Sequence, residues 1–326
     1  MAEGIALIWR TDAHLSDDPP ESRRDDWATT VLGKLAQVGE IARKAKALGV
    51  IDGGDLFHVK APTRNSHALV GRAAAVHAAY SCPTWLVPGN HDLKHGDLRY
   101  LDEGPLGVLY ESGAVRRLYD GHEAAFEKFG IKVRVVGVPY HGTEYDMSRF
   151  AAIKKGDEDW LVAAVHCLAS RSGGDMYERE DVLKYADLLP FAPDVWLFGH
   201  WHKNQGIEET APGKWVVNVG SLSRGSLGKD DLDRLPSCVV LKLTKDKRDA
   251  KIVPLPLTVA PAADVLDVAG KRAELEHDIT MEAFVDNLRD SLGGVGSGSV
   301  VDDVREMAGL DDKTRERAIH YLELAS

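Results

Sequence analysis

Apolar residues along the chain follow two different patterns. Between residues 26 and 48 they recur every three or four positions, as at Trp27, Val31, Leu35 and Val38, which is the period of an amphipathic helix. A second helix is predicted at residues 66–80. Short apolar runs closed by glycine, proline or polar residues predict strands at residues 4–9, 49–55, 83–92, 131–141, 159–167 and 194–202. Because strands alternate with helices, we expect a layered α/β fold.

The pattern changes in the last third of the chain. Runs at residues 214–221, 237–243 and 250–257 predict strands with no helices between them, so we expect the sheet to finish antiparallel. After residue 257 apolar stripes of helical period return, interrupted by a Gly- and Ser-rich joint at residues 293–299. We therefore expect a domain over residues 1–257 and a short, mainly helical C-terminal region over residues 258–326. The stripes of that region pack either on the protein's own core or on the helices of a partner.

Composition narrows the class of protein. Hydrophobic residues make up 44% of the chain and charged residues 28%, as in ordinary globular domains. No apolar run approaches the roughly 18 residues of a membrane span, and the N-terminus lacks the features of a signal peptide. We expect a soluble, cytoplasmic protein with no membrane contact. The cysteines, Cys82, Cys167 and Cys238, are too few and too scattered for a disulfide framework.

Candidate metal ligands follow the predicted strands. They are Asp12 and His14 in TDAH, Asp55 in GGD, Asn90 and His91 in GNHD, His166 in AVHC, and His200 and His202 in GHWH. In open α/β sheets ligands bind beyond the carboxyl ends of the strands, so residues far apart in sequence converge there. Asp, Asn and His together suit Mn²⁺, Fe²⁺ or Zn²⁺. Since the set exceeds what one ion with open positions uses, we expect two ions.

Each motif also has a plainer interpretation when it is taken alone. The TDAH pair is compatible with a helix cap or a polar loop, Gly-Gly-Asp with a turn, and His166 with a hydrogen-bonded histidine of the core. GNHD and GHWH are more specific. The order of the motifs favours a metal site, because all five occur and each follows a predicted strand.

In this order the motifs resemble those of the calcineurin-like metallophosphoesterases, over roughly residues 5–257. The resemblance implies an α/β fold in four layers, a two-sheet β-sandwich flanked by helices, here with a small helical C-terminal appendage. It also implies a dinuclear centre in which Asp55 bridges the two ions. One ion would be held by Asp12, His14, Asp55 and His202, and the other by Asp55, Asn90, His166 and His200.

The resemblance also implies roles for three further residues. His91 matches the family's general acid, which protonates the leaving oxygen, and Asp92 would orient and charge its imidazole. The motif GDLFH (residues 54–58) is similar to that of the SbcD-type DNA repair nucleases. In that subgroup the histidine matching His58 contacts the scissile phosphate and serves exonuclease action. Alternatively, His58 hydrogen-bonds a metal ligand and never meets the substrate.

The subgroup implies a Mn²⁺-dependent DNA nuclease, a 3′ exonuclease and single-strand endonuclease of DNA repair or recombination. Alternatives with the same fold are a phosphodiesterase for small or cyclic nucleotides and a non-catalytic scaffold. The region after residue 257 is shorter than in bacterial SbcD proteins and is compatible with a phage-type member. Without the full capping domain of those proteins, the way in which duplex ends would be recognised is not defined.

Charge bears on the proposed DNA substrate. The net charge of −11 repels a polyanion at long range, although two divalent ions would make the site itself positive. Candidate phosphate contacts, each also compatible with an ordinary surface charge, are Lys60, Arg64, Lys94, Arg171, Lys203 and Arg224. Without a GxxxxGK[ST] motif, ATP dependence would need an SbcC-like SMC-type ATPase partner. A homodimer would enlarge the contact with DNA.

Overall fold

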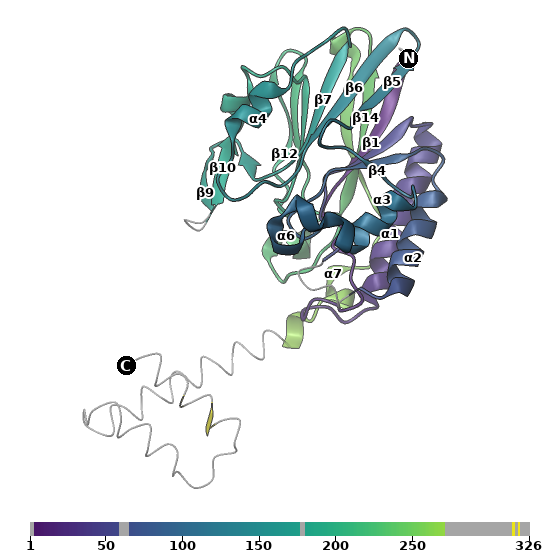
Figure 1. The fold of residues 1–326 in the computed structure, drawn as a ribbon. Helices are drawn as coiled ribbons and strands as arrows, with labels where there is room; N and C mark the ends of the chain where they lie inside the picture. Colours follow the sequence, from purple (N-terminus) through teal and green to yellow (C-terminus); the bar gives the residue numbers. More distant parts are fainter. Residues whose placement is uncertain (1–2, 59–64, 177–179, 271–314, 317–318, 320–326) are drawn as a thin grey trace, which may run out of the picture. The chain divides into compact units, whose positions relative to one another are not determined.

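The computed structural model describes residues 3–58, 65–176, 180–270, 315–316 and 319 (Figure 1). The chain divides into two compact units, residues 1–266 and 267–326. The helical stripes predicted after residue 257, and with them the helical appendage, lie almost wholly outside the described residues. The first unit extends past residue 257 because α7 (Ala262–Val265) packs onto it: Val265 is buried, and its carbonyl accepts a hydrogen bond from the Arg24 amide.

A six-stranded sheet built around the N-terminal strand forms one layer of the first unit. Its strand order is β15-β14-β1-β2-β3-β4. The strands are β1 (Gly4–Arg10), β2 (Gly49–Asp52), β3 (Thr84–Leu86), β4 (Arg116–Arg117), β14 (Ser237–Thr244) and β15 (Lys251–Pro256). Strands β1 to β4 run parallel, whereas β14 is antiparallel to both β1 and β15.

A second six-stranded sheet packs on the first (Figure 1). Its strand order is β12-β13-β11-β7-β6-β5. The strands are β5 (Ala124–Lys128), β6 (Ile131–Val138), β7 (Trp160–His166), β11 (Val195–Gly199), β12 (Gly206–Ala211) and β13 (Lys214–Asn218). The inner four strands are parallel, and the edge strands β5 and β12 are antiparallel to their neighbours. Apolar side chains of both sheets, among them Leu7, Trp9, Trp160 and Val162, form the buried layer between them.

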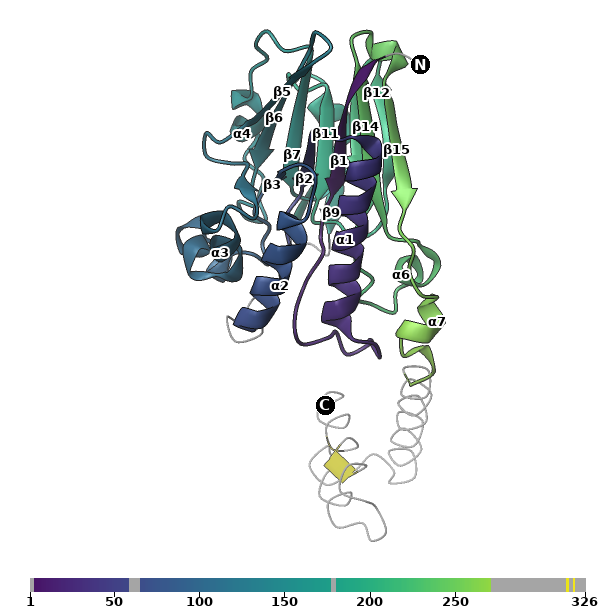
Figure 2. The ribbon, with the colours of Figure 1, turned by 90° about the vertical axis from the view of Figure 1, so that its right-hand side faces the viewer.

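Helices cover the outer face of the first sheet (Figure 2). Helix α1 (Trp27–Ala45) begins where the Asp26 carboxylate accepts the Thr29 amide, and it ends at Lys46, whose φ of 51° is left-handed. Its predicted apolar stripe is buried against the sheet. The same side carries α2 (His67–Ala78), α3 (Pro105–Glu111) and the short turns η2 (Lys94–Gly96) and η3 (Leu98–Glu103).

Smaller elements cover the outer face of the second sheet. They are α4 (Met147–Ala152), α5 (Tyr185–Leu188) and a three-stranded sheet of β8 (Ala169–Ser170), β10 (Glu180–Lys184) and β9 (Gly174–Met176). The predicted fold, a two-sheet sandwich flanked by helices, is therefore confirmed. None of the helices described here is long and apolar enough to span a membrane, and the three cysteines are free thiols.

The prediction for the last strands was partly wrong. Strand β13 pairs parallel with β11 in the second sheet, whereas β14 and β15 belong to the first sheet and are antiparallel, as predicted. A short helix, α6 (Lys229–Asp233), lies between β13 and β14, and η4 (Lys247–Asp249) lies between β14 and β15. The apolar pattern identifies each run as a strand but carries no information about which sheet it joins.

Candidate metal centre

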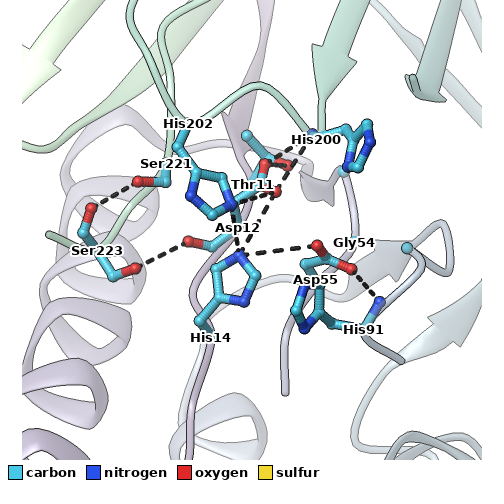
Figure 3. Close-up of polar contacts among 12 residues, drawn as sticks. Thr11, Asp12, His14, Gly54, Asp55, His91, His200, His202, Ser221 and Ser223 are labelled. Carbon is cyan, nitrogen blue, oxygen red and sulfur yellow. Dashed lines mark hydrogen bonds and ion pairs between the residues drawn. The ribbon is translucent and has the colours of Figure 1, made fainter. Parts of the chain in front are cut away.

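The loops after parallel strands of both sheets meet at one place (Figure 3). The Asp12 amide after β1 donates to the Gly54 carbonyl after β2. Nδ1 of His166, the last residue of β7, lies 2.6 Å from the Gly53 carbonyl oxygen. The His200 amide, directly after β11, donates to the Asp12 carboxylate. The first of these bonds joins two strand ends of the first sheet, and the other two join strand ends of different sheets, so the site lies where the two layers meet.

One group of candidate ligands consists of Asp12, His14, Asp55 and His202, whose ligand atoms all lie within 4.8 Å of one another. Nε2 of His14 lies 3.8 Å from Oδ1 of Asp12 and 3.7 Å from Oδ2 of Asp55. It lies 2.8 Å from Nε2 of His202 (Figure 3). Nitrogen and carboxylate oxygen atoms thus converge on one point.

A second group shares Asp55 with the first. The ligand atoms of Asp55, His166 and His200 lie within 4.8 Å of one another, and Nε2 of His166 lies 3.5 Å from Oδ2 of Asp55. Oδ1 of Asn90 lies 3.2 Å from the same nitrogen. The structure therefore brings the seven candidate ligands together in the two groups that the resemblance implies, with Asp55 in both.

The donor atoms fit divalent cations. Oδ2 of Asp55 is buried and makes no hydrogen bond to the residues described, although His14 and His166 flank it. Leaving a buried carboxylate oxygen in this state is costly unless a cation or another partner takes its charge. Oxygen and imidazole donors are the ligands that Mn²⁺, Fe²⁺ and Zn²⁺ accept.

Four of the candidate ligands have left-handed backbone. The φ angles are 55° at Asp12, 50° at His14, 51° at Asp55 and 87° at His200. Such conformations cost on the order of 1–3 kcal/mol for a non-glycine residue and persist where the surroundings impose them. Here the Asp12 and His14 amides donate to the carbonyls of Gly54 and Asp55, each at 2.9 Å. The backbone thus positions the ligands at a cost in stability, as expected of a functional site.

The charges of the site favour ionised carboxylates. Burial alone raises the pKa of Asp12, but the nearby His14 and His166 lower it to about 2. Burial likewise opposes ionisation of Asp55, yet His166 and His14 hold its pKa well below the usual value. Burial lowers the pKa of His166, whereas Asp55 raises it to about 9 overall. Both carboxylates are therefore charged at neutral pH, as metal ligands must be.

Comparison with known proteins identifies the family. The family model described as calcineurin-like phosphoesterase matches residues 11–204, more than half of the chain. The chain belongs to the calcineurin-like phosphoesterases. No curated protein matches the sequence. Membership of this family and the two ligand groups together support phosphoester hydrolysis at a dinuclear metal centre as the reaction of this protein.

Solved structures resemble the phosphoesterase at low sequence identity. A dimetal phosphatase from Danio rerio has a TM-score of 0.47 and 11% identity, and the alignment covers 77% of this chain and 99% of that one. The protein TT1561 of Thermus thermophilus has a TM-score of 0.46 and 15% identity, with 78% and 99% covered. A novel archaeal phosphodiesterase has a TM-score of 0.37 and 15% identity, with 77% and 100% covered.

Two further histidines of the phosphoesterase pack beside the first ligand group. The His91 amide donates to Oδ1 of Asp55 at 2.8 Å, and its ring lies 4.8 Å from that of His14. The His58 ring stacks on the His91 ring, and its Nδ1 lies 3.2 Å from Nδ1 of His14. The structure thus places both predicted catalytic histidines against a candidate metal ligand.

Asp92 contacts backbone in the structure. Its Oδ2 accepts hydrogen bonds from the amides of Asp55 and Gly89, at 2.7 and 3.0 Å, and its Oδ1 accepts one from Phe57 at 3.1 Å. None of these three bonds goes to the His91 ring, which we expected it to orient. Burial, and then Asp55, raise its pKa to about 7. Asp92 therefore ties the GNHD loop to the loop that carries Asp55.

An open cleft of about 440 Å³ leads to the ligands. Its lining includes Asp55, His91, His200, His202 and Lys203. Lys203 is thus the one predicted phosphate contact among the described residues that lines this cleft.

The other predicted phosphate contacts lie elsewhere. Lys94 is partly exposed and Arg171 is exposed, and they form ion pairs with Glu103 and Glu208, each at 2.9 Å. Arg224 is only 3% exposed and donates to the Ala260 carbonyl, so it is buried and does not face the cleft. Lys60 and Arg64 lie outside the described residues.

Sequence reasoning missed residues that contact the ligands from outside the strand-end set. A Cβ atom at Gly89 would overlap the Asp55 carboxylate and the His166 ring. Glu180, which also lines the cleft, accepts a hydrogen bond from Nε2 of His200. Gly89 is part of the GNHD motif, so the requirement for glycine at this position could have been inferred from the sequence. Glu180 lies in no motif, so no signal pointed to it.

Proposed function

We propose that this phosphoesterase is a Mn²⁺-dependent DNA nuclease of the SbcD type, a 3′ exonuclease and single-strand endonuclease in DNA repair or recombination. The position of His58 carries the proposal. It lies three residues after Asp55 and contacts both His14 and His91. A side chain between a metal ligand and a proton donor is well placed to contact the phosphate on which both act.

Residues of the chain have separate roles in the proposed hydrolysis. Bound divalent cations supply an activated water and neutralise charge on the phosphoryl oxygens. His91 holds the proton for the leaving oxygen, and its backbone bond to Oδ1 of Asp55 fixes it relative to the shared ligand. Lys203 offers a positive charge at the cleft wall.

An extended substrate has room beside the site. The cleft borders a second depression of about 710 Å³, and both are lined by Lys203, Gly228 and Asp230. The second depression adds Lys229 and Leu235. Such a path suits a polymer that extends past the scissile phosphate. Because the net charge is −11, stable binding to duplex DNA would rely on an SbcC-like SMC-type ATPase partner or on a homodimer.

A small phosphodiester, such as a cyclic nucleotide, is the second candidate substrate. The cleft is lined by Glu180, Asp230 and Asp231 as well as by Lys203. Acidic side chains along the cleft oppose a polyanion more than a singly charged diester.

The test compares three substrates under Mn²⁺: labelled linear duplex DNA, circular single-stranded DNA and bis-p-nitrophenyl phosphate. The Asp55→Ala variant serves as the control for a contaminating nuclease. Degradation of both DNAs by the wild type and not by the variant is the expected result. Hydrolysis of the small diester with both DNAs intact would overturn the nuclease proposal and favour the small-substrate enzyme.

A further inference from the structure

Glu180 contacts a candidate metal ligand from outside the motifs. It is the first residue of β10, in the small sheet on the outer face of the second sheet. Its Oε1 accepts hydrogen bonds from Nε2 of His200 at 2.9 Å and from the Tyr145 hydroxyl at 2.6 Å. The Glu180 side chain is 17% exposed, so water screens these bonds only partly.

The bond to Glu180 determines which nitrogen of His200 can bind a metal. A neutral imidazole carries one N–H and one lone pair. Because Nε2 faces a carboxylate, the proton resides there and Nδ1 keeps its lone pair. A metal-binding histidine usually has such a partner on its other nitrogen, which fixes the ring and makes it a stronger donor.

Tyr145 anchors this arrangement to the other strand end. The Tyr145 hydroxyl accepts a hydrogen bond from the Leu168 amide at 2.8 Å, two residues after His166. Its own amide donates to the Asp181 carboxylate at 3.2 Å, and the side chain is buried. The Tyr145–Glu180 pair therefore joins the segments that carry His166 and His200, both candidates for the same ion.

We propose that Glu180 is a positioning residue for the second metal site: it holds His200 in the tautomer and orientation that present Nδ1 to the ion. The proposal rests on the dinuclear centre and not on the substrate. A Glu180–His200 hydrogen bond with a purely structural role would stabilise the fold but would leave metal affinity unchanged.

The experiment titrates metal-free protein with Mn²⁺ by calorimetry and follows the spin coupling of the Mn²⁺ pair by electron paramagnetic resonance. In E180A one ion should bind about 10- to 100-fold more weakly, the other should bind as in the wild type, and the coupled signal should require excess Mn²⁺. In E180Q most of the affinity should return, because both hydrogen bonds go to a single oxygen that the amide carbonyl replaces.

A matched control and a second variant keep the test decisive. Glu208 is a partly exposed carboxylate paired with Arg171, so E208A should bind both ions like the wild type. Y145F removes the Tyr145 hydrogen bond to Oε1 and also the acceptor of the Leu168 amide. It should weaken binding of the same single ion by a smaller factor, and it is used if E180A does not fold. Wild-type affinity in E180A, or equal losses in E180Q and E180A, would overturn the proposal. Since the titration contains no DNA, failure of the nuclease proposal would leave its result unaffected.

Discussion

The imidazole rings of His58 and His91 are stacked, with centroids 4.8 Å apart and planes inclined by 19°. His58 lies in the loop after β2, and His91 lies in the loop after β3, so the contact joins two loops of the site. The orientation of the His91 ring, which is predicted to protonate the leaving oxygen, is therefore coupled to that of the His58 ring.

Replacing His58 tests whether this contact serves a polymeric substrate. In His58→Ala, exonuclease activity on linear duplex DNA should fall about tenfold or more, which corresponds to roughly 1.4 kcal/mol in the activation barrier. Hydrolysis of bis-p-nitrophenyl phosphate and the Mn²⁺ content should change little. His122→Ala, at an exposed histidine, is the control. Equal losses on all substrates would show that His58 only supports the metal ligands.

Replacing His91 should separate chemistry from metal binding. His91→Ala should keep both ions, since its described contacts to the ligands are a backbone bond to Asp55 and ring packing on His14. Loss of a general acid lowers turnover by about 10²- to 10⁴-fold when the leaving oxygen is basic. With p-nitrophenolate as the leaving group the loss should be smaller. Normal turnover of DNA by the variant would contradict the general-acid assignment.

Gly89→Ala should disrupt the centre without removing a ligand. The added Cβ would overlap Oδ1 of Asp55 and lie 2.5 Å from Cε1 of His166, so the shared ligand must move. We expect loss of bound metal, measured by elemental analysis, and loss of hydrolysis. Gly71→Ala is the matched control, because nothing lies within 4 Å of its Cβ and the residue is in α2. That change should raise stability by up to about 1 kcal/mol. A fully metallated Gly89→Ala protein would contradict the prediction.

Lys34 should make stability depend on pH. Its ammonium is buried on α1, has no hydrogen bond within the described part of the chain, and lies 6.0 Å from the centre of the Trp27 ring. Burial, and then Arg23, Arg224 and Arg234, lower its pKa from 10.5 to about 7. Between these values the unfolded chain binds more protons than the folded one, so stability rises with pH through this window.

Lys34→Met removes that dependence. Chemical denaturation should show the wild type gaining on the order of 2 kcal/mol relative to the variant between pH 7 and pH 9, and the variant should be the more stable protein at pH 7. Lys44→Met, at a side chain that is 70% exposed, should follow the wild type at every pH. Parallel stability curves for wild type and Lys34→Met would show that the ammonium has its ordinary pKa.

The motifs predicted most of the residues that the structure brings together in the candidate site, because each motif is local. Asp12, Asp55, Asn90, His166 and His200 each follow an apolar run closely, so strand prediction and ligand prediction coincide. Glu180 was not predictable in this way, since its role depends on a contact with His200 across the small sheet. Arg224 was misplaced because sequence proximity to a motif does not reveal which side of the loop a long side chain takes. The pairing of β14 with β1 joins distant parts of the chain, such as Leu7 with Leu241, and period alone does not encode such a register.

Both layers of the sandwich contribute ligands to each half of the candidate metal centre. Asp12 and Asp55 follow strands of the first sheet, whereas His166 and His200 end or follow strands of the second. The apolar layer between the sheets is close-packed, and such layers transmit a change in side-chain volume as a shift of the packed elements. Side chains outside the centre, such as Leu7 and Val162, thereby set the spacing between the ligands from the first sheet and the ligands from the second. The geometry of the candidate metal centre is then partly a property of the hydrophobic core.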